Sequence, residues 1–230
     1  MKTIGLIGGM SWESTVTYYQ IINETIREEL GGLHSARILM YSVDFAEIER
    51  SMSAGDWDRC AAILADAAKR LEAAGADFIL ICTNTLHKVA PEVSKQLSIP
   101  LLHIAEAAAA KLTEAGISTV GLLGTGFTMT QTFYSDVLAK HGIRVIIPEG
   151  GDIRRVNDII FDELCVGISK EESRKAFSRI MADLRVRGAQ GIVLGCTELG
   201  LLIRPEDSGL PLFDTAVIHA RAAACAALAE

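Results

Sequence analysis

The feature of this sequence that most constrains its fold is an internal repeat. The segment KTIGLIGG at 2–9 is echoed by STVGLLGT at 118–125, and GADFILI at 75–81 is echoed by GAQGIVL at 188–194. Both pairs have nearly the same spacing, which predicts two similar structural units in tandem. Each echoed segment is a short apolar run that ends in a glycine or leads into a polar loop, as strands of open α/β sheets do at their ligand-binding ends.

Apolar runs with β-branched residues alternate with stretches of helical periodicity along the chain. This alternation is typical of parallel sheets wrapped by helices. We therefore expect an α/β fold of two similar doubly wound parallel-sheet domains in tandem, with the active site in the cleft between them. Strands are expected at 3–7, 37–42, 78–82, 101–104, 119–123, 144–147 and 191–194. Helices are expected at 58–73, 106–114, 131–140, 153–164, 170–187 and 216–228.

The domain boundaries follow from two segments that contain proline. We expect an N-terminal domain of residues 1–98 plus 210–230 and a C-terminal domain of residues 99–209. The Ser-Ile-Pro segment at 98–100 marks the first boundary. The segment 205–211, which has a proline at each end, would return the last helix to the first domain.

Composition disfavours several classes of function. The net charge is −7, and the lysines and arginines are scattered, so there is no basic stripe suited to nucleic acid. No apolar run approaches the roughly 20 residues that cross a bilayer, and the N-terminus lacks a secretory signal. Five cysteines without a CxxC pair disfavour a disulfide framework or a zinc site. We therefore expect a soluble cytoplasmic protein with reduced thiols that binds neither nucleic acid nor membrane.

Four loops follow predicted strands, at 8–11, 83–85, 124–126 and 196–198, and they should converge if the two domains face each other. The glycines lack the order GxGxxG, and there is no GxxxxGK[ST] motif, so a dinucleotide or phosphate site is disfavoured. Backbone N–H groups beside these glycines could instead approach a small anion such as a carboxylate.

The internal alignment sets Thr83 opposite Cys196, and the pair Asn84 and Thr85 opposite Thr197 and Glu198. Each loop thus carries a reactive or hydroxyl-bearing side chain followed by polar groups that could hold a carboxylate. Thr and Asn are also common helix caps, which is the structural interpretation of either loop alone. Two matched loops, each at the end of a strand, favour a binding site.

The loop motifs resemble those of the cofactor-independent aspartate/glutamate racemases. The likeness covers essentially the whole chain, and it rests on GGMSWEST at 8–15, CTNTLH at 82–87, LGT at 123–125 with Thr128, and GCTE at 195–198. It implies an amino-acid racemase that acts on a small amino-acid substrate without pyridoxal phosphate, any other cofactor or a metal ion. A homodimer is usual for the family.

In this family two cysteines stand on opposite faces of the substrate's α-carbon, and one removes a proton as a thiolate while the other delivers one. The resemblance therefore implies that Cys196 and Thr83 occupy the catalytic positions. Hydrogen bonds already in position would stabilise the carbanion, whose charge spreads onto the carboxylate. The substrate-binding residues implied are Met10, Met52, Asn84, Thr85, Thr125, Thr128, Thr197 and Glu198, of which Asn84, Thr85, Thr125 and Thr197 match carboxylate-binding positions.

The first catalytic position departs from the family pattern Cys-Asn-Thr, because Thr83 precedes the Asn-Thr pair and Cys82 lies one residue earlier. A shift of one residue on a strand reverses the direction of a side chain, so we expect Cys82 to be buried in the sheet. A threonine hydroxyl is a far weaker acid than a thiol and cannot store a proton-abstracting anion at neutral pH. We therefore expect Cys196 to deprotonate L-amino acids and Thr83 to be a poor proton donor, which makes turnover slow and one-sided.

The substrate's side chain is less constrained. Racemases of this group often have a polar or basic residue near Met52 and near Val166, where this chain is apolar. An unpaired buried carboxylate is costly, so a small neutral amino acid becomes an alternative to aspartate or glutamate. Arg50 and Lys170 are the remaining cationic candidates for an acidic side chain.

Two other functions stay open at this point. Relatives with one catalytic cysteine include arylmalonate decarboxylases and maleate isomerases, and Thr83 makes this chain resemble such a member. A catalytically silent amino-acid binding protein would also keep the loops. We expect His87 to have a structural role rather than a place in the site, and His103 and His219 show no metal-binding spacing.

Overall fold

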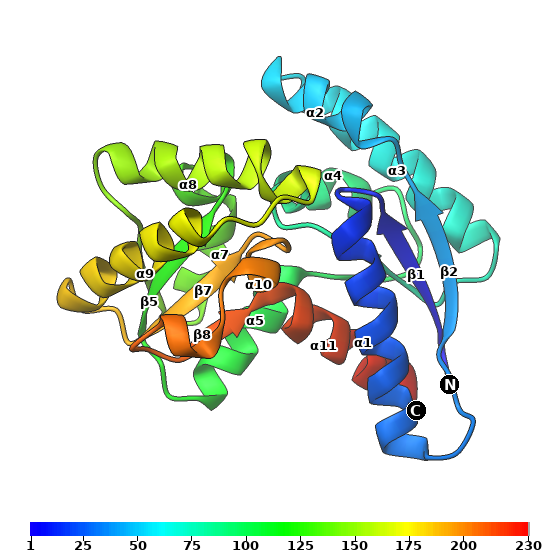
Figure 1. The fold of residues 1–230 in the computed structure, drawn as a ribbon. Coiled ribbons are helices and arrows are strands. Elements are labelled where there is room, and N and C mark those ends of the chain that lie inside the picture. The colour runs from blue at the N-terminus through cyan, green and yellow to red at the C-terminus, as the bar shows by residue number, and fades with distance from the viewer. Residues whose placement is uncertain (230) are drawn as a thin grey trace. The chain divides into compact units, whose positions relative to one another are not determined.

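In the computed structural model, which describes residues 1–229, the chain forms two four-stranded parallel sheets, each with its own helices (Figure 1). The first compact unit comprises Met1–Ile104 together with the segment from His219 onward, and the second comprises Ala105–Ile218. The strand order is β2-β1-β3-β4 in the first sheet and β6-β5-β7-β8 in the second. The same topology occurs twice, so the expected α/β fold with two similar parallel sheets is confirmed.

The first unit is built on two buried central strands. Its strands are β1 (Thr3–Gly8), β2 (Arg37–Ser42), β3 (Phe78–Ile81) and β4 (Leu101–Leu102). The helices that connect them are α1 (Trp12–Leu30), α2 (Phe45–Ser53), α3 (Trp57–Ala73), the 3₁₀ turn η1 (Thr85–Val89) and α4 (Ala90–Ser94). Ile7 at the end of β1 lies opposite Ile81 at the end of β3, so the loops after these strands leave the sheet side by side.

The second unit repeats this plan. Its strands are β5 (Thr119–Gly124), β6 (Arg144–Ile146), β7 (Gly191–Gly195) and β8 (Leu212–Asp214). The helical segments are α5 (Ile104–Glu114), α6 (Gly126–Thr130), α7 (Thr132–Lys140), α8 (Gly151–Asp162), η2 (Leu164–Val166), α9 (Glu171–Val186), α10 (Leu199–Leu202), η3 (Pro205–Asp207) and α11 (Thr215–Leu228). Gly124 pairs with Gly195, so β5 and β7 also end together.

The boundaries between the units lie later in the chain than we expected. Strand β4 pairs with β3, which keeps residues 99–104 in the first unit. Strand β8 pairs with β7, which keeps residues 210–218 in the second unit. As a result α5 belongs to the second unit after its first residue, whereas α11 returns to the first unit from His219. Strand pairing, and not the prolines, sets these boundaries.

Helices α1 and α2, the short helices α4, α6 and α10, and strand β8 were not predicted. Helix α1 begins after Ser11, whose hydroxyl oxygen accepts a hydrogen bond from the Ser14 N–H, as a helix N-cap does. Its buried side chains include Tyr18, Ile22 and Ile26, which follow one another at a spacing of four residues. That spacing indicates the buried face of a helix and is visible in the sequence alone. Strand β8 is only three residues long, which is too short for a period of two to stand out.

A buried histidine lies at the point where the chain returns to the first unit. The His219 Nε2 atom lies 2.9 Å from the Leu102 carbonyl oxygen, and its Nδ1 atom lies 2.9 Å from the Tyr18 hydroxyl. A carbonyl only accepts, so Nε2 carries the proton and Nδ1 accepts from the tyrosine. Burial is the main reason that the pKa of His219 falls to about 3. The neutral ring joins α1, the end of β4 and α11.

We expect His219 to make the stability of the protein depend on pH. In the unfolded chain an imidazole titrates near about 6.5, so between that pH and about 3 the unfolded state binds a proton that the folded state excludes. The free energy of unfolding should therefore fall with acidification below about pH 6.5, with a contribution from this residue of at most about 1.4 kcal/mol per pH unit. Urea denaturation of the wild type and of His219→Gln between neutral pH and about pH 4 measures the contribution of His219 to the free energy of unfolding.

The variant His219→Gln should have a lower free energy of unfolding than the wild type at neutral pH but should lose less of it on acidification. The exposed His34 provides the matched control, since His34→Gln removes a histidine without touching a buried hydrogen bond, and its pH dependence should follow the wild type. Equal slopes for the wild type and His219→Gln would contradict the assignment.

Candidate active site

The loop after β1 is closed by hydrogen bonds to the start of α1. Gly9 has φ +91°, and a Cβ at this position would collide with the Val43 carbonyl. The Gly9 N–H donates to the Thr15 hydroxyl oxygen over 2.9 Å, and the Thr15 hydroxyl donates to the Ser11 carbonyl over 2.8 Å. Met10, a predicted substrate-binding residue, is buried within this loop.

The loop after β3 carries the first predicted catalytic position. Cys82 is fully buried, as expected, and burial raises the pKa of its thiol. Thr83 follows it, and its N–H donates to the Ile81 carbonyl over 2.9 Å in a tight turn. Asn84 and Thr85 continue the loop into η1, and both are buried polar residues.

The loop after β5 has a fixed pair of hydroxyl groups. Thr125 is the N-cap of α6, and its hydroxyl oxygen accepts from the Thr128 N–H over 3.3 Å. The hydroxyls of the two threonines lie 3.2 Å apart. The Gly126 N–H donates to the Asn157 side-chain oxygen over 2.9 Å, which fixes the start of the helix.

The loop after β7 contains a buried thiol beside a buried carboxylate. The Cys196 thiol donates to Glu198 Oε2 over 3.0 Å, and the Thr197 hydroxyl donates to the same oxygen over 2.8 Å. Burial first, and then the negative charge of Glu198, hold the pKa of the Cys196 thiol well above its ordinary range. Burial and the charge of Glu198 also raise the pKa of Asp214 at the end of β8. The sulfur therefore rests as a thiol that already has a proton acceptor.

Each unit thus presents its own group of predicted site residues at the carboxyl ends of its two central strands. In the first unit these are Met10, Thr83, Asn84 and Thr85. In the second unit they are Thr125, Thr128, Cys196, Thr197 and Glu198. In chemical terms the second group offers hydroxyl groups and a thiol that is hydrogen-bonded to a carboxylate, and the first offers hydroxyl and amide groups.

The residues predicted to surround a substrate side chain are not in these four loops but on or beside the helical segments α2 and η2. Met52 is buried in α2, whereas Arg50 on the same helix is exposed. Val166, at the end of η2, is 60% exposed. The Lys170 ammonium group forms an ion pair with Glu163 over 3.1 Å, so this cation already has a carboxylate partner.

His87 was not among the predicted site residues, yet it contacts the Thr83 loop directly. Its Nδ1 atom lies 2.7 Å from the Thr83 carbonyl oxygen, and the Ile104 N–H donates to its Nε2 atom over 3.1 Å. The ring is buried and packs edge-on against His103, with 4.5 Å between ring centroids. The only sequence signal was its place two residues after the Asn-Thr pair.

Neither a metal site nor a membrane-spanning helix is found among the described residues. Within residues 1–229, no three His, Cys, Asp or Glu side chains are grouped so that they could hold a metal ion. Over the same residues, no helix has both the length and the apolar character needed to span a membrane.

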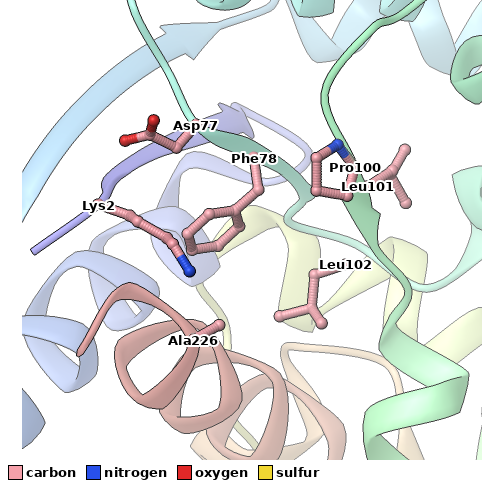
Figure 2. A pocket seen from close by; sticks show the side chains of 7 residues that line it. All are labelled: Lys2, Asp77, Phe78, Pro100, Leu101, Leu102 and Ala226. Carbon is pink, nitrogen blue, oxygen red and sulfur yellow. The ribbon is translucent and has the colours of Figure 1, made fainter. Parts of the chain in front are cut away.

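A pocket of about 400 Å³ lies at the opposite end of the first sheet (Figure 2). Lys2, Asp77 and Pro100 immediately precede β1, β3 and the short β4, so the pocket marks the amino ends of these strands. The Asp77 carboxylate accepts a hydrogen bond from the Thr3 N–H over 2.5 Å, which gives this side chain a structural role. The lining residues are Lys2, Asp77, Phe78, Pro100, Leu101, Leu102 and Ala226, and none is a predicted site residue.

Comparison with known proteins identifies similar chains over nearly the full length. The family model described as Asp/Glu/Hydantoin racemase matches residues 7–223. The broad specificity amino-acid racemase RacX of Bacillus subtilis is 25% identical over 222 residues, which is 95% of each chain. A candidate Asp/Glu racemase from Yersinia pestis has a TM-score of 0.93 and 52% identity, with 100% of both chains covered. The aspartate racemase homologue PH1733 of Pyrococcus horikoshii has a TM-score of 0.85 and 36% identity, with 99% of both chains covered.

Proposed function

Because this chain belongs to the Asp/Glu/hydantoin racemase family and is an amino-acid racemase, we propose that it inverts the α-carbon with one thiol and one threonine hydroxyl and without pyridoxal phosphate. The observation that carries the proposal is the Cys196 thiol, which is buried at the end of β7 and donates to the Glu198 carboxylate. Counted from the strand registers, the equivalent position in the first unit is Thr83.

In the first step Cys196 must become a thiolate, because a neutral thiol is not a base. The thiol proton passes to Glu198 Oε2, the oxygen to which the thiol already donates. The carboxyl group then becomes neutral, which removes the repulsion that raises the pKa of the thiol. The family resemblance implies that Glu198 binds substrate. A carboxylate would repel that of the amino acid, so we assign it the role of proton acceptor.

In the second step the thiolate takes the α-proton of the L-amino acid. The electron pair left on the carbon spreads onto the substrate's carboxylate, where hydrogen-bond donors stabilise the developing charge. Asn84, Thr85, Thr125 and Thr197 are our candidates for these donors, since they lie at the ends of the central strands of their units. Met10 and Thr128 are proposed to complete the walls of the site.

In the third step Thr83 supplies a proton on the opposite face. Solvent water then returns a proton to the Thr83 oxygen, and Glu198 releases to solvent the proton that it took from Cys196. The proposal requires the Thr83 and Cys196 loops to act on opposite faces of one substrate. The reverse reaction would need a threonine alkoxide as base, and a hydroxyl is a far weaker acid than a thiol. We therefore propose that the α-proton of L-amino acids is removed much faster than that of D-amino acids, while inversion is slow in both directions because the two enantiomers have equal free energy.

We propose that small neutral amino acids are substrates, alongside aspartate and glutamate. Met52 offers an apolar side chain, Val166 is exposed, and Lys170 is already paired with Glu163. An acidic side chain would therefore have to attract Lys170 away from Glu163 or recruit the exposed Arg50, whereas a methyl or hydroxymethyl group would need no cation. The name of the Bacillus subtilis relative, which describes a broad specificity racemase, agrees with a wide range.

We propose that the protein works in the cytoplasm as a homodimer. Its five free cysteines suit a reducing compartment. Helix α1 carries three exposed apolar side chains at a helical spacing, namely Trp12 at 66%, Val16 at 55% and Tyr19 at 52% exposure. Such a row on one helix face is typical of a contact with another chain, and we take the partner to be a second copy.

The first prediction concerns the α-proton. In heavy water the wild type should replace the α-hydrogen of an L-amino acid by deuterium, and exchange from the D-enantiomer should be at least about 100-fold slower. Cys196→Ala should abolish exchange, while Cys225→Ala, at an exposed cysteine, should leave it unchanged. Proton NMR of both enantiomers measures the rates.

Companion variants separate this mechanism from its rivals. Glu198→Gln keeps an acceptor oxygen but cannot take a proton, so exchange should fall about tenfold or more. Equal exchange from both enantiomers, or full activity in Cys196→Ala, would refute the mechanism. Carbon dioxide release from arylmalonates would point to a single-thiol decarboxylase, and tight binding of an amino acid without any exchange would point to a binding protein.

The second prediction concerns the substrate. We expect kcat/KM for small neutral L-amino acids such as alanine and serine to equal or exceed that for L-aspartate and L-glutamate. Chiral chromatography of a panel of L-amino acids, with protein dialysed free of pyridoxal phosphate, measures the values. Strict preference for the two acidic amino acids would contradict the proposed range.

The third prediction concerns the dimer. Sedimentation velocity should give the mass of two chains for the wild type and of one chain for Val16→Glu, because a buried charge in the contact is costly. Val186, which is 86% exposed on α9, supplies the matched control, and Val186→Glu should stay dimeric. A wild type that sediments as a monomer, or a dimeric Val16→Glu, would exclude this face.

A further inference from the structure

The His87 ring bridges two backbone groups inside the first unit. The Thr83 carbonyl can only accept a hydrogen bond, so His87 Nδ1, at 2.7 Å from its oxygen, must carry a proton. The Ile104 N–H can only donate, so His87 Nε2, at 3.1 Å, must be unprotonated. These two partners fix one neutral tautomer. The ring therefore joins the loop after β3 to the residue at which α5 begins.

The bridge acts on the residue whose hydroxyl we assign to the third step. Holding the Thr83 carbonyl fixes the peptide plane on one side of its Cα, and the bond from the Thr83 N–H to the Ile81 carbonyl fixes the other side. With both planes fixed, the side chain has only its own rotation about χ1, and a β-branched residue has few allowed rotamers. Thr83 is thus oriented by its backbone.

The second unit has no equivalent bridge. Counted from the strand registers, Gly200 is the counterpart of His87 in the second unit, and Asp214 is the counterpart of His103. A Cβ at Gly200 would collide with the Asp214 carboxylate, so no side chain has room there. In the first unit the same two positions are filled by the packed rings of His87 and His103. A change at His87 would therefore remove a bridge to the Thr83 loop that has no counterpart at the Cys196 loop.

We propose that His87 is a positioning residue for the reprotonation step, which holds the Thr83 hydroxyl in line for transfer to the α-carbon without itself exchanging protons with the substrate. This inference rests on the proposed function. Both ring nitrogens are occupied by backbone groups and the ring is buried, so neither can reach a substrate. Burial, followed by the neighbouring His103 and His219, lowers the pKa of His87 well below its ordinary range, which keeps the ring neutral.

A change at His87 should separate removal of the α-proton by Cys196 from reprotonation on the Thr83 side. Cys196 still forms the carbanion if Thr83 is misplaced, but capture from the opposite face becomes slow. The carbanion then returns to the L-form with a proton from the Cys196 side, which solvent deuterium replaces. Exchange without inversion should therefore increase relative to inversion.

The test compares two amides at position 87 in heavy water. The Asn amide can reach the place of Nδ1 and donate to the Thr83 carbonyl, while the longer Gln amide can reach the place of Nε2 and leave that carbonyl without its donor. We expect His87→Gln to invert L-substrate about tenfold more slowly or worse, with α-proton exchange within about threefold of the wild type. His87→Asn should keep an exchange-to-inversion ratio close to that of the wild type. Proton NMR gives exchange, and chiral chromatography gives inversion.

The outcomes are distinct from those that test the proposed function. Equal loss of exchange and inversion in His87→Gln, or the same ratio in both variants, would reduce His87 to a purely structural residue. Exchange that survives in Cys196→Ala would instead overturn the proposed function. Nitrogen NMR of the wild type labelled at histidine requires no variant to fold. It should show His87 as the neutral Nδ1–H tautomer, and a ring protonated at Nε2 would refute the proposal.

Discussion

The close approach of two central strands in each sheet is the constraint on which the site depends. In the second unit Gly124 and Gly195 are paired neighbours, and a Cβ at Gly124 would lie 2.8 Å from the Gly195 carbonyl oxygen. The absence of side chains lets the two strands end together. The next residues, Thr125 and Cys196, therefore begin their loops at the same edge of the sheet. Hydroxyls, a thiol and a carboxylate gather there because parallel strands present their carboxyl ends on one side.

Much of the fold could be predicted from the sequence, because a repeat of apolar runs is visible without knowledge of tertiary contacts. The limits of that prediction are specific. Strand β8 is three residues long, and the chain passes between units after β4 and within α11. Periodicity reports which face of a helix is buried but not which sheet buries it. The boundaries at Ile104 and His219 therefore depend on pairing and packing far apart in sequence.

The candidate site was predictable to the extent that it follows strand ends. Cys196, Thr83 and their polar neighbours all occupy that position. The relation of Cys196 to Glu198 was not predictable, because a carboxylate two residues after a thiol can bind a ligand, cap a helix or accept the thiol's proton. The hydrogen bond that Glu198 accepts from the Cys196 thiol and its burial support the role that we propose for it. Likewise, a histidine after a loop gives no sign of its tautomer, which only its two backbone partners fix.

The return of α11 to the first unit also affects when that unit can finish folding during synthesis. Ala220, Ala223, Ala224 and Ala227 of α11 are fully buried in the unit that contains the N-terminus, and the Lys2 N–H donates to the Ala227 carbonyl over 2.8 Å. Chains emerge from the ribosome N-terminus first, and their domains usually fold in that order. Here the earliest strand acquires its last neighbour only after α11 has been made. The first sheet must wait, with part of its apolar surface uncovered, until α11 has been synthesised.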